Sequence, residues 1–208
     1  MSSSSRDQIL SRVRSALAPL PQRAALPDWD RELVILREAH AGVDPWTLFT
    51  ERLRNVNGTP LVGPAALVDY LAKNNFLHGY CDPALHADFA PAFAASTATF
   101  NVETTFDRTR VDDFQFGITA ATGAIAETGT LILSDNVKSR RLGALTPWVH
   151  VAVIRRAQIH LDLPTAIAAL PADPNIIWVT GPSKTADVEG ILIEGVHGPG
   201  IQIALLLE

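Results

Sequence analysis

The chain has 208 residues, of which 47% are hydrophobic and 19% are charged, and its formal net charge is −5. This composition is that of a globular protein with one sizeable core, and it excludes global disorder. The net negative charge argues against a general affinity for nucleic acid or for anionic membranes.

A helical arm is predicted at the start of the chain, because apolar residues recur there at helical spacing behind Ser5, a candidate N-cap. Pro19 and Pro21 end this helix, and a Pro-rich linker follows. We therefore divide the chain into residues 1–28, a helical arm with its linker, and residues 29–208, a single α/β domain. The arm is expected to dock on the body of the protein or on a second subunit.

Residues 30–56 are predicted to be helical, as two helices with a break around Gly42 and Pro45. Asp44 caps the second helix, with Pro45 at its first position. The next elements are a strand, a helix and a strand, over residues 59–63, 64–75 and 76–81. This spacing is typical of a parallel α/β unit.

Residues 97–106 alternate between apolar and polar side chains, which predicts a half-exposed strand. Five short runs rich in Ile, Val and Leu follow, at residues 114–119, 130–134, 150–154, 175–181 and 201–207. Such runs suit strands that are covered on both faces. With a helix predicted over residues 163–171, the pattern indicates an α/β fold with an open, mostly parallel sheet flanked by helices.

Cys81 is the only cysteine, so the chain cannot form an internal disulfide or supply the thiolates of an iron–sulfur cluster. A buried structural thiol is the favoured interpretation, because Cys81 ends a predicted strand. Residues 1–17 lack the apolar core of a secretory signal, and no apolar run approaches the roughly 18 residues of a spanning helix. We expect a cytoplasmic protein without a membrane span.

Two nucleotide-binding motifs fail when they are tested against the sequence. The P-loop pattern requires glycine where the chain has Trp178 and Ser183. Gly198 and Gly200 lack the third glycine of the dinucleotide fingerprint, and a strand follows them instead of a helix. The histidines show no metal-ligand spacing, so no metal site is predicted.

Three polar clusters border the apolar strands: residues 127–129, residues 181–187 and residues 195–200. In open α/β sheets, ligands collect beyond the carboxyl ends of the strands, so we expect the clusters to share one pocket there. If a helix began near residue 185, its free N–H groups and Lys184 would form an anion site. Asp187 would then lie in the first turn of that helix.

Glu127 is the candidate catalytic residue, because a lone carboxylate among small apolar residues is the kind of group that enzymes use as an acid or base. The candidate ligand-binding residues are Thr128, Gly129, Arg140, Gly181, Ser183, Lys184, Thr185, Asp187, His197 and Gly198. Each has a structural alternative. Glu127 could accept hydrogen bonds from glycine turns, the small polar residues could be caps and turn formers, and the basic residues could be solvated.

The order of motifs from about residue 115 onward resembles the lactate utilization protein C (LutC/YkgG) family, the LUD-domain proteins. The motifs are "AETGT", then "RRLGALTPWVH", then "GPSKTADVE" and "GVHGP". The combination is specific, although each motif alone is weak. The chain departs from the family at Lys184, where arginine is more usual, so the positive charge is kept but the bidentate fork is lost.

The resemblance implies a fold similar to the NagB/RpiA/CoA transferase-like group. It also implies a non-redox subunit of a system that oxidises L-lactate to pyruvate with iron–sulfur partners of the LutA/LutB type. Such a subunit needs no cofactor in this chain, and its ligand is expected to be a small anionic metabolite. Two alternatives stay open: a scaffold or regulatory protein without a ligand, and a stand-alone isomerase, transferase or ligase acting on a phosphorylated or carboxylated metabolite. Whether the chain is an enzyme is left open.

Overall fold

The structure is a computed structural model, and it describes residues 4–19, 40, 42–134, 140–170, 173, 175–186 and 191–208. The chain divides into two compact units, residues 1–39 and residues 40–208. The first predicted helix of residues 30–56 falls almost entirely outside the described residues.

The first unit contains the predicted N-terminal helix, α1 (Ser5–Leu17). Its N-cap is Ser4, one residue before the expected position, and the Ser4 hydroxyl accepts a hydrogen bond from the Asp7 backbone N–H at 3.3 Å. This contact satisfies one of the free N–H groups of the first turn. Ile9, Val13 and Leu17 form an exposed apolar stripe along the helix.

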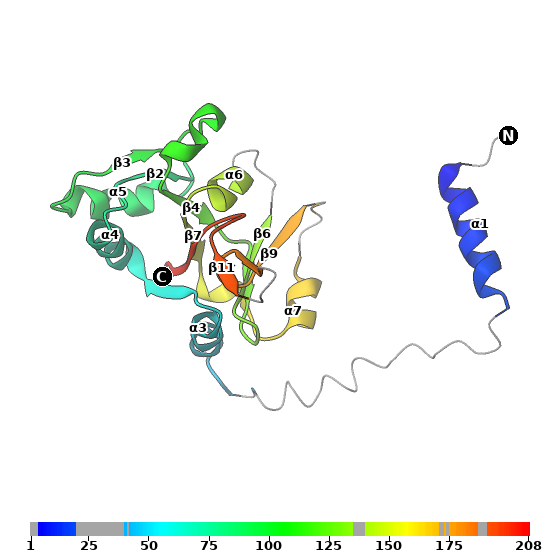
Figure 1. Ribbon diagram of the computed structural model, residues 1–208. Helices are drawn as coiled ribbons and strands as arrows, with labels where there is room; N and C mark the ends of the chain where they lie inside the picture. The colour runs from blue at the N-terminus through cyan, green and yellow to red at the C-terminus, as the bar shows by residue number, and fades with distance from the viewer. Residues whose placement is uncertain are drawn as a thin grey trace. The chain divides into compact units, whose positions relative to one another are not determined.

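The second unit is built on a six-stranded sheet in which every pairing is parallel (Figure 1). The strand order is β1 (Thr59–Val62), β12 (Ile201–Leu206), β7 (Val149–Ile154), β4 (Phe116–Ala120), β2 (His78–Cys81) and β3 (Asn101–Glu103). The α/β fold class with a mostly parallel, open sheet is therefore confirmed. The last strand of the chain lies beside the first, so the two ends of the domain are joined through the sheet.

Helices cover one face of this sheet, α4 (Gly63–Lys73) and α5 (His86–Ala95). The alternation of side chains along β7 shows how the strands are buried. Val149, Val151 and Val153 pack with the helices, whereas Ala152 and Ile154 point to the opposite face. Both faces of the sheet are buried, as the apolar runs predicted.

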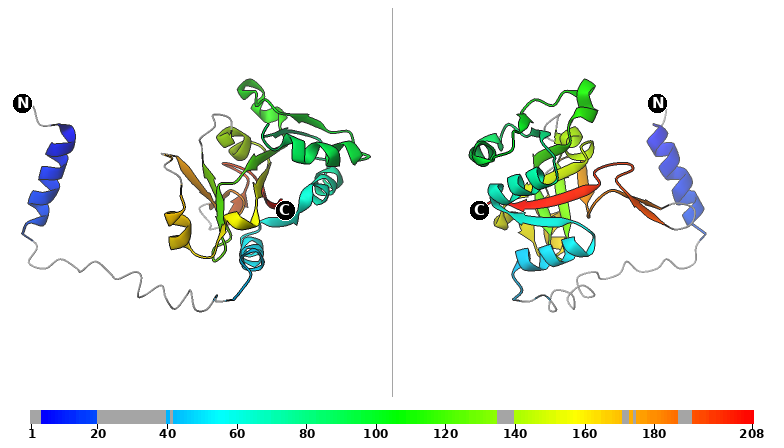
Figure 2. Two further views of the ribbon diagram at one scale, coloured as in Figure 1. Left: turned by 180° about the vertical axis from the view of Figure 1, so that it is seen from behind. Right: turned by 60° about the vertical axis from the view of Figure 1, so that its left-hand side comes forward.

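The opposite face is covered by α3 (Pro45–Asn55), α6 (Arg140–Leu145) and a second sheet (Figures 1 and 2). This mixed sheet has the order β8 (Ile159–His160), β5 (Gly123–Ile125), β6 (Thr130–Ser134) and β9 (Ile176–Val179), and α7 (Leu163–Ala168) packs beside it. The sequence did not predict a separate sheet, because short apolar runs look alike whichever sheet they join. Alanines at the centre of this interface, including Ala152 and Ala204, allow the two sheets to approach closely.

The remaining elements are short: η1 (Arg108–Asp113), η2 (Arg156–Gln158), and a hairpin of β10 (Lys184–Ala186) and β11 (Leu192–Glu194) that projects from the domain (Figure 2). The predicted strand over residues 97–106 is reduced to β3. It ends early because the chain turns so that Phe106 can pack with Tyr80 and Phe114.

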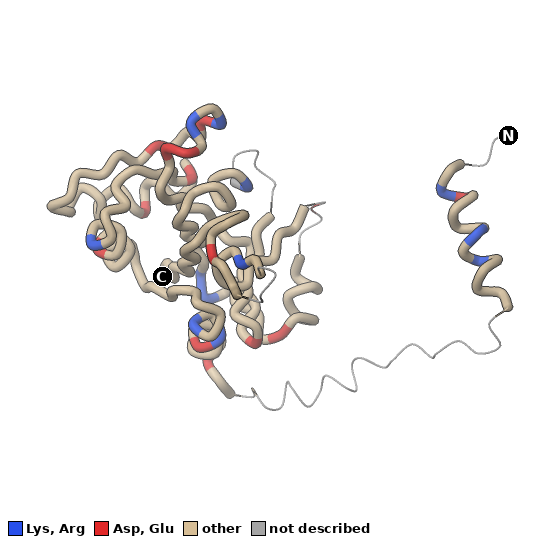
Figure 3. Tube along the Cα trace, viewed as in Figure 1, with Lys and Arg blue, Asp and Glu red and all other residues tan. Residues whose placement is uncertain are grey.

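Local signals at the start of α3 are confirmed. The Asp44 carboxylate accepts a hydrogen bond from the Thr47 N–H at 2.9 Å, and Pro45 occupies the first helical position. This hydrogen bond and a second one from the Thr47 hydroxyl lower the pKa of Asp44. The central strands β12, β7 and β4 carry no Lys, Arg, Asp or Glu, whereas Glu103 lies on the edge strand β3 (Figure 3). None of the helices in the described residues is long and apolar enough to cross a membrane.

The single cysteine is buried at the end of β2, as predicted. Burial, together with the nearby negative charges of Asp82 and Asp88, raises the pKa of the Cys81 thiol to about 12. The thiol is therefore uncharged at neutral pH and belongs to the apolar core.

Candidate functional site

Glu127, Thr128 and Gly129 form the tight turn between β5 and β6. Gly129 has a φ of +67°, and a Cβ atom at this position would lie 2.5 Å from the backbone nitrogen of Leu53 in α3. Glycine is required here both for its left-handed conformation and for the close approach of the helix. The carboxylate of Glu127 accepts a hydrogen bond from the N–H of Leu163, the first residue of α7, at 2.8 Å.

A chain of hydroxyl groups joins this turn to the end of β9. The Thr128 and Thr130 hydroxyls lie 2.7 Å apart, and the Thr130 and Thr180 hydroxyls lie 2.8 Å apart. The next residue, Gly181, has a φ of +78°, and a Cβ atom there would lie 2.2 Å from the carbonyl oxygen of Val56. The first two polar clusters are thus neighbours, and both pack against the end of α3.

The second and third polar clusters form one cleft. The Ser183 N–H donates to the Pro199 carbonyl at 2.9 Å, and the Gly195 N–H donates to the Ser183 carbonyl at 2.9 Å. A hollow of about 260 Å³, which we name the loop cleft, is lined by residues 177–183, residues 197–199, Ala144, Leu145 and Gln202. Among these described lining residues none is acidic, and the Ser183 hydroxyl and the His197 ring supply hydrogen-bond donors.

Lys184 and Thr185 lie on β10, so the condition set for an anion site here, a helix that begins near residue 185, is not met. The Lys184 ammonium group lies 3.3 Å from the Val56 carbonyl and 3.4 Å from the Glu194 carboxylate. Glu194 also accepts a hydrogen bond from the Asn57 amide at 2.8 Å, and this bond, followed by the contact with Lys184, lowers the pKa of Glu194. Lys184 therefore ties the hairpin to the end of α3.

The structure brings together four of the predicted site residues, Gly181, Ser183, His197 and Gly198, around the loop cleft. Glu127 and Lys184 do not line it, and their predicted roles in catalysis and ligand binding stay predictions. Asp187 and the side chain of Arg140 lie outside the described part of the chain. The cleft lies where β9 ends and β12 begins, and not beyond the carboxyl ends of the parallel strands as we expected.

A buried polar network that was not predicted from the sequence lies behind the loop cleft. The Nε2 atom of His150 lies 2.9 Å from the Thr119 hydroxyl, and its Nδ1 atom lies 2.9 Å from the Gln202 side-chain oxygen. Since an amide oxygen only accepts hydrogen bonds, Nδ1 carries the proton and Nε2 accepts from Thr119. Gln202 lines the loop cleft, and Thr119 lines a small internal cavity beside Arg141. The signal was one polar residue in each of the apolar strands β7 and β12, His150 and Gln202, with Thr119 near the end of β4.

Burial lowers the pKa of His150 from 6.5 to about 4, although the hydrogen bond with Gln202 opposes this shift. Between these pH values the unfolded chain binds a proton at His150 and the folded chain does not. Stability is therefore expected to fall as the pH falls from 6.5 towards 4, by roughly 3 kcal/mol. Denaturant unfolding over this pH range would measure the loss, and the part that comes from His150 should be missing from a His150→Leu variant, which should therefore show a shallower slope. The same slope in both proteins would contradict the assignment.

Comparison with known proteins decides the family. The model of the LUD domain matches residues 49–207. The chain belongs to the LUD domain family. The match covers nearly the whole second unit, including the six-stranded sheet and the loop cleft, so the architecture described above is that of this LUD domain.

Relatives of this LUD domain include proteins that are named for lactate utilization. Lactate utilization protein C of Deinococcus radiodurans is 37% identical over 87 residues, which is 39% of this chain and 41% of that protein. The protein of the same name from Bacillus licheniformis is 33% identical over 98 residues, 43% of this chain and 41% of that protein. The chain thus matches about two fifths of the length of these relatives.

Two further relatives extend over more of the chain. An uncharacterized protein of Neisseria meningitidis is 24% identical over an alignment of 222 residues, which covers 94% of this chain and 90% of that protein. The crystal structure of a DUF162 family protein from Deinococcus radiodurans has a TM-score of 0.57 and 24% sequence identity, and it covers 78% of this chain and 96% of that one. This likeness shows the fold of the LUD domain.

A second hollow of about 410 Å³, which we name the indole cleft, adjoins the loop cleft and shares Leu145 and Gly198 with it. It is lined by, among others, Phe76, Asp112, Phe114, Gln115, Thr146 and Trp148. The six-membered ring of Trp148 lies against Gly195 and Gly200, where a Cβ atom would come within 2.4 Å of it. The two glycines therefore support this half-exposed indole of the LUD domain.

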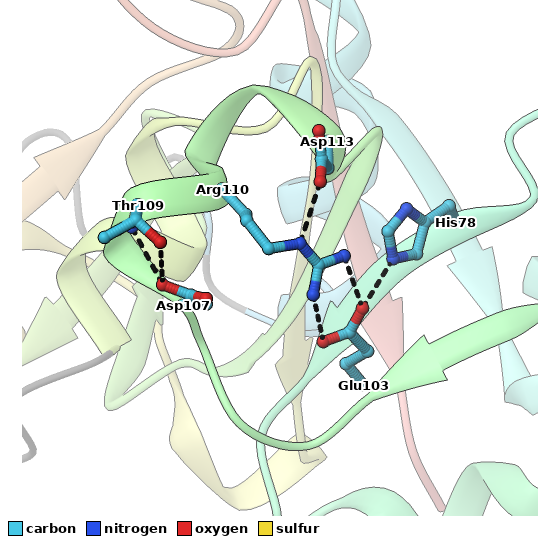
Figure 4. Close-up of polar contacts among 6 residues, drawn as sticks. All are labelled: His78, Glu103, Asp107, Thr109, Arg110 and Asp113. Atoms are coloured by element: carbon cyan, nitrogen blue, oxygen red, sulfur yellow. Dashed lines mark hydrogen bonds and ion pairs between the residues drawn. The ribbon is translucent and has the colours of Figure 1, made fainter.

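An ionic cluster lies beside the indole cleft (Figure 4). Glu103 contacts the His78 ring at 2.8 Å and the Arg110 guanidinium at 3.0 Å, and these hydrogen bonds, with that of His78 the larger, lower the pKa of Glu103. Arg110 also pairs with Asp113 at 2.9 Å. The cation next to the cleft is thus held by two carboxylates, whereas the exposed Asp112 lines the cleft itself.

Proposed function

We propose that this chain is a non-redox subunit of an L-lactate oxidation system, that it acts with iron–sulfur partner proteins, and that it binds a small anionic ligand in the loop cleft. The observation that carries the proposal is the LUD-domain match together with several relatives named lactate utilization protein C. These relatives match about two fifths of this chain, and their name refers to lactate utilization alone. The L-lactate oxidation system and its iron–sulfur partners are therefore part of the proposal.

The cysteine content supports a non-redox role for this chain. The only cysteine is buried and uncharged, so this chain cannot supply the thiolates that hold an iron–sulfur cluster. Electron transfer through such clusters therefore falls to the partner proteins.

The chemistry of the loop cleft supports an anionic ligand. Its described lining has no carboxylate to repel an anion, and the Ser183 hydroxyl and the His197 ring can donate hydrogen bonds to one. Gly198 carries no side chain that would fill the space, and a Cβ atom there would lie 3.2 Å from the Ser183 Cβ atom. A ligand in the cleft can thus approach the loop backbone closely.

In the organism that carries this chain, deletion of its gene is expected to abolish growth on L-lactate and to leave growth on pyruvate intact. A tagged copy should restore growth and should co-purify with iron–sulfur proteins. The double variant Ser183→Ala/His197→Ala is expected to fold, to keep its partners and to fail to restore growth, because it removes the donors of the loop cleft.

The matched control is His86→Ala, which removes a partly exposed histidine from α5 on the other side of the six-stranded sheet. This variant should restore growth fully. Normal growth on L-lactate after deletion, with no co-purifying iron–sulfur protein, would refute the proposed function. If the double variant restored growth fully, the loop cleft would not bind a required anion, and a scaffold role would be favoured instead.

A further inference from the structure

The two clefts, which together we call the groove, share Leu145 and Gly198 in their lining but differ in chemical character. In the loop cleft, the described lining contains hydroxyl and imidazole donors and no acid. In the indole cleft, the described lining contains three aromatic residues and Asp112, and no Lys, Arg or His. One compartment favours an anion, and the other favours a group with positive charge or hydrogen-bond donors.

Trp148 is suited to stacking. The residue is 48% exposed although its six-membered ring packs against Gly195 and Gly200, so part of the indole remains open to a ligand. The main chain holds the residue in place as well, because the Trp148 carbonyl accepts a hydrogen bond from the Ile201 N–H at 3.0 Å. An aromatic ring held by backbone loses little freedom when a planar ligand stacks on it.

The charge at the indole cleft is negative. Arg110 is engaged by Glu103 and Asp113, which leaves Asp112 as the charged group on the described lining. A carboxylate beside an exposed indole recognises a ring that carries N–H donors or a positive charge. A purely hydrocarbon ring would not use this acid.

We propose that the groove binds a ligand of the nucleotide class, with its planar nitrogen-containing ring on Trp148 beside Asp112 and its anionic group beside Ser183 and His197. The combined hollows, about 410 and 260 Å³, are of the size that accommodates such molecules. This binding does not require the P-loop or the dinucleotide fingerprint, which the chain lacks. It rests on the anion site of the proposed function and is independent of the place of the chain in lactate oxidation.

The test is titration calorimetry of the full chain with adenosine monophosphate, nicotinamide mononucleotide, adenosine and inorganic phosphate. At least one of the two nucleotides is expected to bind at least tenfold more tightly than phosphate, because stacking of its base on the indole adds to the contacts of the anionic group. Binding of that nucleotide should also quench tryptophan fluorescence, and Trp148→Leu should remove this part of the signal.

Variants separate the two compartments. Asp112→Asn is expected to weaken the nucleotide about tenfold and to leave phosphate unchanged, since a hydrogen bond to a charged group is lost. Ser183→Ala/His197→Ala should weaken nucleotide and phosphate alike. Asp69→Asn, which alters an exposed acid on α4, is the matched control and should change neither.

Nucleotides that bind no better than phosphate would overturn this inference and leave the anion site of the loop cleft standing. A nucleotide whose affinity is unchanged in both Asp112→Asn and Trp148→Leu would overturn it as well. If none of the four probes binds, the inference fails, whereas growth and co-purification with the double variant still decide the proposed function.

Discussion

Replacing Gly129 by alanine is expected to destabilise the chain by roughly 2–5 kcal/mol. The residue has a φ of +67°, a left-handed conformation that costs alanine free energy, and the added Cβ atom would lie 2.5 Å from the Leu53 nitrogen and 2.6 Å from the Arg52 carbonyl carbon. These are backbone atoms of α3, so they can retreat only if the helix shifts off the second sheet. The midpoint of denaturant unfolding measures the loss.

Gly63 provides the matched control. Its φ is +77°, so an alanine there suffers the same conformational cost, but no atom lies within 4 Å of the added Cβ. Gly63→Ala should therefore lose only about 1–2 kcal/mol. Equal losses in the two variants would show that the contact between the turn and α3 is not tight.

Replacing His150 by leucine is expected to cost roughly 2–5 kcal/mol, although the two side chains are similar in size. His150 is fully buried, and its removal leaves the Thr119 hydroxyl and the Gln202 side-chain oxygen without their hydrogen-bond partner. An unsatisfied buried polar group costs free energy that an apolar group of the same shape does not.

A double-mutant cycle isolates the contact between His150 and Thr119. The double variant Thr119→Val/His150→Leu should lose less stability than the sum of the two single variants, by roughly 0.5–3 kcal/mol, because the second change removes a hydroxyl that the first left unsatisfied. Urea unfolding of the four proteins gives the coupling energy. Strict additivity would mean that the hydroxyl and the imidazole do not depend on each other.

Local sequence signals predicted much of the fold because their causes are local. The Asp44–Pro45 pair set the start of α3, and the apolar runs located β6, β7, β9 and β12 within a few residues. The division of these strands between two sheets was not predictable, since it depends on which runs meet across the core. The hairpin of β10 and β11 was also not predicted. Lys184 becomes part of a strand only because it pairs with Glu194, ten positions later in the chain.

The candidate site was predicted in part for the same reason. Glycine and proline mark the loops around Gly181 and Gly198, so their clustering at one cleft could be anticipated from the sequence. The side chain of Glu127 could not be placed in this way, because its direction is set by an N–H of α7 that lies 36 residues away in the chain. The buried His150 was visible in the sequence only as one polar residue in an apolar strand, and nothing local identified its two partners.

The sealed position of Cys81 has a practical consequence for spectroscopy on this chain. The thiol is buried and its pKa is raised to about 12, so maleimide reagents should not react with it while the protein is folded. A second cysteine introduced at Leu192, which is 65% exposed on the hairpin, can then be labelled selectively without altering the natural residue. A dye or spin label there would report on whatever approaches that edge of the domain.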